Sequence, residues 1–190
     1  HQRAHLLAAA GLLHDVGKVG EPAGIDLRAE DRNLESSICP VRDNRYTHRH
    51  VLWTARAIDL ARTNWGGLDR GELFRVASYH HRPSNDSLDQ WLLQRADHLA
   101  SGHDRRSGGE EQAVTGLFSV FPRLVPEDPG RHGDDLQLPT CPMGFGEDAF
   151  LPRAAQDIGA YRERCRQLAA AIDAALGQPF SSPSDCVDGL

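Results

Sequence analysis

The feature that most constrains this chain is an apolar helical run that ends in a histidine and an aspartate. Residues 2–17 (QRAHLLAAAGLLHDVG) are rich in Ala and Leu, which favour helix, and their apolar positions recur at helical spacing. His14 and Asp15 are expected in the last turn, and Lys18 follows them. The buried stripe is predicted to contain Leu6, Ala9, Ala10, Leu13 and Gly17. A chain that begins in this way is expected to bury the stripe against other helices.

Adjacent residues of a helix point about 100° apart. His14 and Asp15 can therefore share one metal ion only if the ion lies between their two directions. One direct ligand with one supporting residue, or two ions, would also satisfy that geometry. Lys18 is the one Lys beside twenty Arg. A compact ammonium at this point suits the stabilisation of developing negative charge, although its identity could also be chance.

A second amphipathic helix is predicted over residues 47–64, with Thr47 as its N-cap. His50 falls on its inner face, where it would be a metal ligand or a hydrogen-bonded core histidine. His48 is turned away by about 200° on an ideal helix and is expected at the surface.

A third helix is predicted over residues 69–79 and ends in the pair His80-His81. Arg82 and a following proline prevent its continuation. The histidine pair is a surface accident or, given the His-Asp before it and an aspartate after it, a pair of ligands.

A fourth helix is predicted over residues 87–101, opened by a capping box of Ser87 and Gln90. Asp97 lies among apolar residues, and a buried carboxylate is costly unless it is paired or bound to metal. The buried side is predicted to contain Leu88, Trp91, Leu92, Arg95, Ala96, Leu99 and Ala100.

The rest of the chain is less regular. Residues 19–46 have no sustained periodicity and read as an irregular connection. After the fourth helix, Arg105 and Arg106 lie in a glycine-rich stretch that either grips phosphate or is an ordinary solvated loop. An apolar extended segment is predicted over 115–125, and a loop-like region over 126–150. An amphipathic helix is predicted over 152–176, with Pro152 near its start, and a linker-like tail follows it.

Composition excludes several classes of protein. The net charge of −6 offers no global basic field for duplex nucleic acid. No apolar run approaches the ~20 residues that span a bilayer, and no signal peptide is visible. Four scattered cysteines without a CxxC pair argue against a zinc knuckle or a disulfide framework and fit a reducing cytoplasm. The first residue is not Met, so we expect a trimmed chain or part of a longer protein.

Together, the polar residues form a possible metal-ligand set of imidazoles and carboxylates. The candidate metal ligands are His14, Asp15, His50, His80, His81 and Asp97. Neutral imidazole and carboxylate suit one or two ions of manganese, nickel, cobalt or iron. Such an ion generates a hydroxide nucleophile at neutral pH, and His14, Asp15 and Lys18 are the candidate catalytic residues. We therefore expect a metal-dependent phosphodiester hydrolase.

These residues resemble the HD superfamily, a mostly α helical bundle with irregular loops. GLLHDVGK (11–18), ASYHH (77–81) and especially ADHLASGHDRR (96–106) resemble the N-terminal HD nuclease domain of the large subunit of type III CRISPR effector complexes. LFSVF (117–121) resembles the segment that follows in that family, without its leading proline. The superfamily's first, upstream histidine has no counterpart here.

The resemblance implies a metal-dependent nuclease that cuts single-stranded DNA within a cytoplasmic complex of guide RNA and other subunits. It carries the metal and catalytic positions over to the six ligands named above. Strand binding would rest on local arginines, with Arg82, Arg105 and Arg106 as the candidates, or on neighbouring subunits. The domains are predicted as an HD domain over 1–112, a connecting segment over 113–151, and a helix with a linker over 152–190 that leads to a palm domain absent from this chain.

Two other functions fit the residues. A stand-alone HD phosphohydrolase would act on nucleotides or cyclic dinucleotides and would turn them over without cutting DNA. An inactive HD scaffold would dock other subunits and bind no metal.

Overall fold

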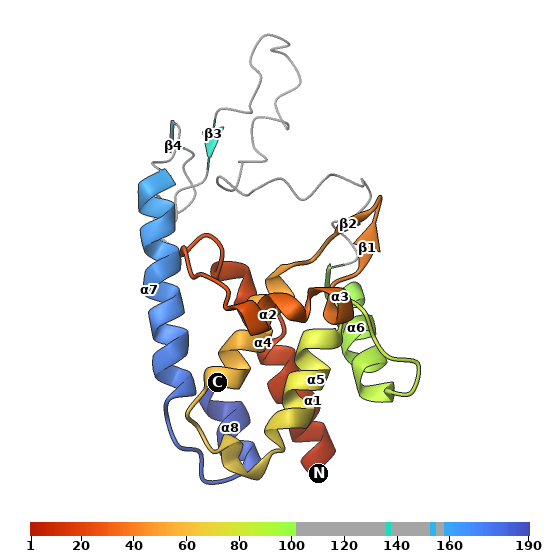
Figure 1. The fold of residues 1–190 in the computed structure, drawn as a ribbon. Helices are drawn as coiled ribbons and strands as arrows, with labels where there is room; N and C mark the ends of the chain where they lie inside the picture. The colour runs from red at the N-terminus through yellow and green to blue at the C-terminus, as the bar shows by residue number, and fades with distance from the viewer. Residues whose placement is uncertain (102–135, 138–152, 155–157) are drawn as a thin grey trace, which may run out of the picture. The chain divides into compact units, whose positions relative to one another are not determined.

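The structure, a computed structural model, describes residues 1–101, 136–137, 153–154 and 158–190 (Figure 1). The described part is mostly helical, which confirms the predicted fold class. The α-helices are α1 (Gln2–Leu13), α2 (Ala29–Asn33), α3 (Glu35–Ile38), α4 (His50–Leu60), α5 (Arg70–Tyr79), α6 (Leu88–Ser101), α7 (Ile158–Leu176) and α8 (Pro183–Gly189). Two 3-10 turns, η1 (Val16–Val19) and η2 (Trp65–Gly67), and the strand pairs β1 (Val41–Arg42) with β2 (Arg45–Tyr46) and β3 (Leu136–Gln137) with β4 (Arg153–Ala154) complete the described elements.

The chain divides into two compact units. One consists of His1–Ser107 with Arg166–Leu190, and the other of Gly108–Cys165. In the second unit the described residues form the antiparallel β3–β4 pair and the first turns of α7. The predicted boundaries at residues 112 and 151 stay predictions.

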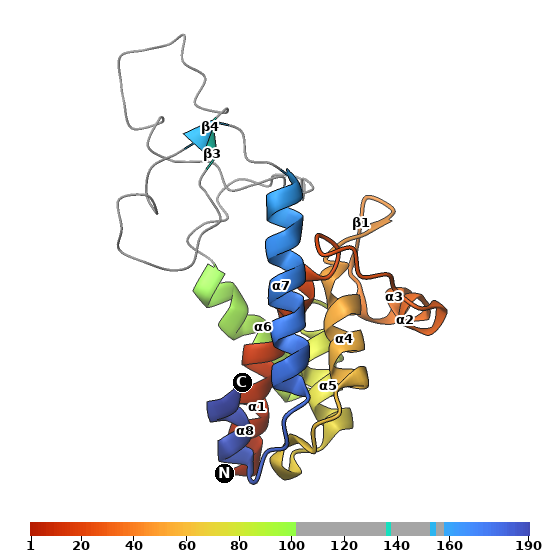
Figure 2. The same ribbon diagram turned by 90° about the vertical axis from the view of Figure 1, so that its left-hand side faces the viewer.

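The core of the first unit lies among α1, α5 and α8, and α8 lies beside α1 (Figure 2). The predicted α1 stripe is confirmed, because Leu6, Ala9, Ala10 and Leu13 are all buried there. A second cluster joins α4 to the segment before it. Its buried residues are Leu27, Ile38, Cys39, Val51, Leu52, Trp53 and Ala55.

The connection over residues 19–46 is more ordered than predicted. It contains α2, α3 and the β1–β2 hairpin, in which Val41 pairs with Tyr46. Asp43 and Asn44 form the two-residue turn, with φ of 49° and 58°. Asp and Asn tolerate the left-handed region that such turns require, so the dipeptide was a usable signal for the hairpin.

The predicted buried side of α6 is wrong. Leu88, Leu92 and Leu99 are 60%, 45% and 84% exposed, whereas Gln90 and Leu93 are buried. The packed face follows positions 90, 93 and 97, because polar Gln90 is held inside by bonds to backbone groups: its Oε1 accepts from Ser84 N at 2.7 Å and its Nε2 donates to the Arg75 carbonyl at 3.2 Å. The Gln90 side chain therefore does not complete the predicted capping box with Ser87.

The C-terminal elements also differ from prediction. The helix predicted from Pro152 begins at Ile158, because Arg153–Ala154 pairs with Leu136–Gln137 instead. The tail expected to be a linker contains α8, which Ser182 caps by accepting from Asp185 N at 3.1 Å and which Pro183 starts. The predicted segment 115–125 lies outside the described residues. None of the described helices has the length and apolarity to cross a membrane.

Candidate metal centre

The centre begins where α1 ends. His14 is the last residue with helical dihedral angles, and Asp15 leaves the helix with φ −105° and ψ 1°. Asp15 was expected in the last helical turn, where it would point about 100° away from His14. Because the helix stops between them, His14 Nε2 and Asp15 Oδ2 lie 3.3 Å apart. Both side chains therefore reach the same place.

Gly17 and Thr54 form the contact between this turn and the start of α4. Gly17 N donates to Thr54 Oγ1 at 3.1 Å, and that hydroxyl donates to the His14 carbonyl at 2.9 Å. A Cβ on Gly17 would lie 2.0 Å from the carbonyl oxygen of His50. The glycine thus allows the segment with His14 and Asp15 to approach the helix that carries His50.

The histidine pair lies at the end of α5. His80 is fully buried, and its Nδ1 lies 2.6 Å from the Ala77 carbonyl. Since a carbonyl only accepts, Nδ1 carries the proton and Nε2 presents a lone pair. Burial lowers the pKa of His80 to about 4, so the imidazole is neutral at pH 7. Burial, together with the neighbouring His80, also lowers the pKa of His81 well below its usual range.

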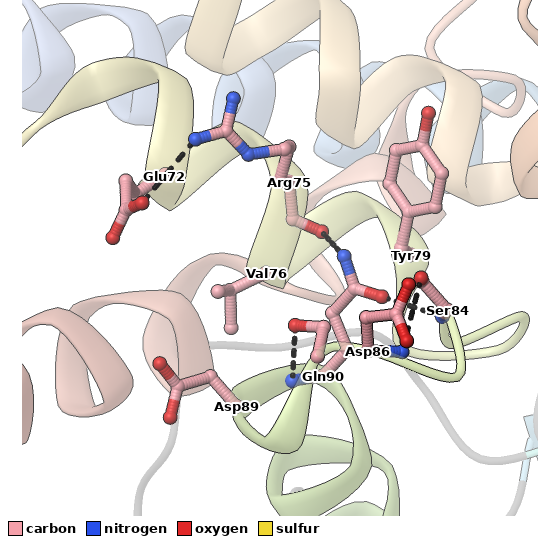
Figure 3. Close-up of a pocket in the computed structure, with 9 residues that line it drawn as sticks. Glu72, Arg75, Val76, Tyr79, Ser84, Asp86, Asp89 and Gln90 are labelled. Carbon is pink, nitrogen blue, oxygen red and sulfur yellow. Dashed lines mark hydrogen bonds and ion pairs between the residues drawn. The ribbon is translucent and has the colours of Figure 1, made fainter.

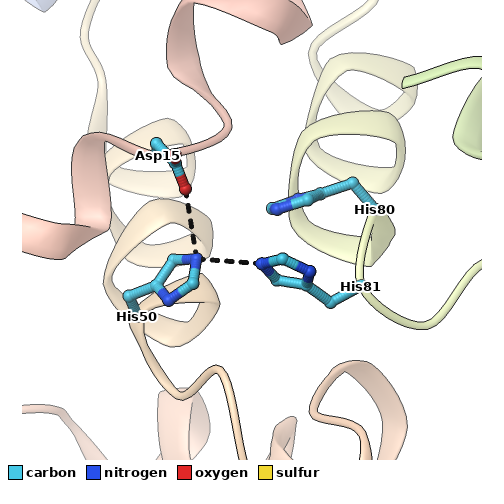
Figure 4. Close-up of side chains that lie close together, drawn as sticks. All are labelled: Asp15, His50, His80 and His81. Carbon is cyan, nitrogen blue, oxygen red and sulfur yellow. Dashed lines mark hydrogen bonds and ion pairs between the residues drawn. The ribbon is translucent and has the colours of Figure 1, made fainter. Parts of the chain in front are cut away.

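Four of the predicted ligands form one group. Figure 4 shows Asp15, His50, His80 and His81 converging from three separate segments. His50 Nε2 lies 3.2 Å from Asp15 Oδ1 and 3.3 Å from His81 Nε2. One potential ligand atom from each of the four lies within 4.8 Å of the others.

The other two predicted ligands form an overlapping group with His80. His14 Nε2 lies 3.7 Å from Asp97 Oδ1, and the side chain of Asp97 is only 11% exposed. His14, His80 and Asp97 also place one ligand atom each within 4.8 Å. His80 belongs to both groups and so links them. The structure therefore brings all six candidates together.

The donor atoms fit a divalent metal ion. Five buried side-chain atoms lack a hydrogen-bond partner in the described part of the chain, and three of them belong to this centre: His14 Nε2, Asp15 Oδ1 and His80 Nε2. Leaving such atoms unsatisfied is costly. His14 Nδ1 lies 2.7 Å from the Gly11 carbonyl, so its Nε2 is the acceptor, as in His80. A second-sphere carbonyl that fixes the tautomer in this way is typical of metal-binding histidines.

Asp15 supplies the negative charge of the centre. Burial alone would raise its pKa, but His50 and Lys18 outweigh that effect and hold the pKa well below its usual range. Lys18 Nζ lies 2.6 Å from Asp15 Oδ2, and the Lys18 side chain is half exposed. The ammonium group therefore lies at the edge of the centre, beside a carboxylate that is ionised at neutral pH.

His48 is the residue that the sequence argument misplaced. It was expected on the solvated side of a helix, but α4 begins at His50 and His48 has φ 54°. Its ring is half-buried, 4.1 Å from the ring of His81 between centroids. The predicted N-cap, Thr47, instead donates its hydroxyl to the Pro40 carbonyl at 3.3 Å. The angle of about 100° per helical residue does not apply to His48, because His48 precedes α4.

The predicted strand-binding arginines have different outcomes. Arg82 donates through Nη1 to the carbonyls of Ser36 and Cys39, the latter at 3.2 Å, so it ties the end of α5 to the end of α3. Arg105 and Arg106 lie outside the described residues. All three assignments to strand binding stay predictions.

A separate surface cavity of about 280 Å³ lies between α5 and α6 (Figure 3). None of the six candidate ligands lines it. Its Arg75 is paired with Glu72 at 3.3 Å, and Gln90 is tied to backbone groups on both sides. The cavity is thus distinct from the metal centre.

Comparison with known proteins agrees with this geometry. The model of the HD domain matches residues 2–102, just over half of the 190-residue chain, and the matched range contains all six candidate ligands. No curated protein and no solved structure gives a significant match. The chain belongs to the HD domain family of metal-dependent hydrolases.

Proposed function

We propose that this chain is a metal-dependent nuclease that cuts single-stranded DNA as the HD domain of a type III CRISPR effector complex. The observation that carries the hydrolytic part is that four histidines and two aspartates converge, and that three of their buried atoms have no hydrogen-bond partner. A scaffold has no use for so costly an arrangement.

The chain's own residues would hold and orient the reacting groups. The six ligands would bind one or two divalent ions of manganese, nickel, cobalt or iron. When bound, such an ion supplies Lewis-acid activation of a phosphodiester and of water. Because His14 and His80 are fixed by carbonyls and Asp15 by Lys18, their donor atoms need no rearrangement. Lys18 would stabilise negative charge on the phosphate.

The finer assignment rests on sequence likeness. GLLHDVGK and ASYHH contain four of the six ligands, and ADHLASGHDRR contains a fifth, Asp97, followed by Arg105 and Arg106. This combination supports single-stranded DNA as substrate and guide RNA and other subunits as partners in the cytoplasm.

The test is cleavage of labelled single-stranded DNA in Mn²⁺, Ni²⁺ or EDTA. Asp15→Asn removes a charged ligand without changing shape, and we expect it to slow cutting at least about 100-fold. Asp26→Asn is the matched control, since Asp26 is exposed and lies outside the centre. Equal cutting by Asp15→Asn and wild type would refute the assignment. Turnover of cyclic dinucleotides without DNA cutting would favour the phosphohydrolase instead.

A further inference from the structure

The β1–β2 hairpin holds two arginines directly opposite each other. Arg42 and Arg45 are cross-strand partners, and both are exposed. Like charges in this position repel each other and destabilise a hairpin. Neither guanidinium has a hydrogen-bond or ion-pair partner in the part of the chain that the structure describes, and Asp43 in the turn between them forms no ion pair with either.

Neighbouring arginines are used differently. Arg49 donates to Glu35 at 2.7 Å, Arg32 to the Leu27 carbonyl at 3.2 Å, and Arg82 to two carbonyls. These side chains hold the fold together. The hairpin pair does not, so its repulsion is not offset by any contact within the described residues.

The hairpin is fixed beside the metal centre. At its base Thr47 N donates to the Pro40 carbonyl at 2.9 Å, and Arg82, directly after His81, bonds the Cys39 carbonyl. Arg45 is three residues from His48, a distance of at most about 11 Å along the chain. The His48 ring in turn lies against that of His81. A phosphate held by the hairpin would therefore lie close to the centre.

We propose that the Arg42–Arg45 pair binds the phosphodiester backbone of a single-stranded nucleic acid and guides it to the metal centre. This inference rests on the proposed nuclease function. Two guanidinium groups that face solvent together match phosphate oxygens, which accept paired hydrogen bonds. A phosphate between them also removes their mutual repulsion. In a chain of net charge −6, such a local pair supplies the positive charge that attracts a polyanion.

The experiment separates strand binding from catalysis. Binding of a fluorescent single-stranded DNA is measured by anisotropy in EDTA, for wild type and Arg42→Gln/Arg45→Gln. Arg62→Gln is the matched control, because Arg62 is an exposed arginine beyond the other end of α4. Hydrolysis of bis(p-nitrophenyl) phosphate in Mn²⁺ reports on the centre alone, and thermal denaturation confirms folding. A single-stranded RNA of the same sequence tests which sugar is accepted.

We expect the double variant to bind the oligonucleotide on the order of tenfold more weakly at low salt, with a salt slope smaller by about 1.4 for two lost phosphate contacts. Its hydrolysis of the small diester and its melting temperature should match those of Arg62→Gln. Equal binding by the two variants, or no binding of either strand by wild type, would overturn the inference. Failure to hydrolyse the small diester would count against the nuclease, whatever the binding result.

Discussion

Gly17 is the position where the smallest change should disturb the metal centre most. In Gly17→Ala the added Cβ would lie 2.0 Å from the His50 carbonyl oxygen and 2.6 Å from Thr54 N. Both atoms are backbone, so no side chain can swing aside. Reaching ordinary contact at 3.4 Å requires a displacement of 3.4 − 2.0 = 1.4 Å between the His14–Gly17 turn and α4. The ligands Asp15 and His50 lie on opposite sides of that contact.

We expect Gly17→Ala to lose about 2 kcal/mol of stability from overpacking, and roughly 100-fold in activity from a ligand displacement of more than 1 Å. The measurements are the urea midpoint and phosphodiester turnover in Mn²⁺. Gly11→Ala is the matched control in α1, since its Cβ would meet nothing nearer than Leu93 Cδ1 at 3.9 Å and Ala favours helix. If the two variants turned over substrate equally, the argument that Gly17 sets the spacing of the centre would be wrong.

Three further predictions concern stability. The pKa of buried His80 is about 4 in the native state against an ordinary 6.5, so the unfolded chain takes up this proton first as the pH falls. In EDTA this one group should cost the native state about 2 kcal/mol of stability between pH 7.5 and 5, and His80→Gln should reduce the total loss in urea titrations by that amount. Asp31, whose side chain is 3% exposed, has a pKa lowered to about 2 because its bonds to Arg28 and Arg56 outweigh the effect of burial. This shift contributes about 2 kcal/mol of stability above pH 4, which is lost as the pH falls towards 2. Asp31→Asn should remove that stability at pH 7 without changing the affinity for Mn²⁺. Thr54→Val should cost roughly 1–3 kcal/mol, because it leaves Gly17 N and the His14 carbonyl without their hydroxyl partner; no change in the urea midpoint would contradict this.

The sequence predicted those parts of the structure that depend on local periodicity. The buried stripe of α1 and the positions of α4 and α5 follow from apolar spacing, and that spacing placed His50 in the first turn of α4. The order of the polar residues suggested a metal centre before any contact was known. All six candidates then proved to lie together.

The remaining features depend on tertiary contacts that periodicity does not encode. The wrong face of α6 was chosen because Leu88, Leu92 and Leu99 were assigned to the buried side, whereas Gln90 is buried by bonds to a neighbouring turn and helix. His48 was misplaced because the start of α4 is set by a positive φ, not by a cap that the sequence displays. His14 and Asp15 can share one centre because the helix ends between them. Only the dihedral angles of the structure show that end.

The imidazoles and carboxylates of the centre are expected to hold divalent metal. The most direct measurement is calorimetric titration of Mn²⁺ into EDTA-treated, desalted chain, for wild type, Asp15→Asn, His80→Gln and the control Asp26→Asn. We expect one or two bound ions in wild type and the control, and at least about tenfold weaker binding in the other two. No Mn²⁺ binding by wild type, or equal binding by all four proteins, would contradict this expectation.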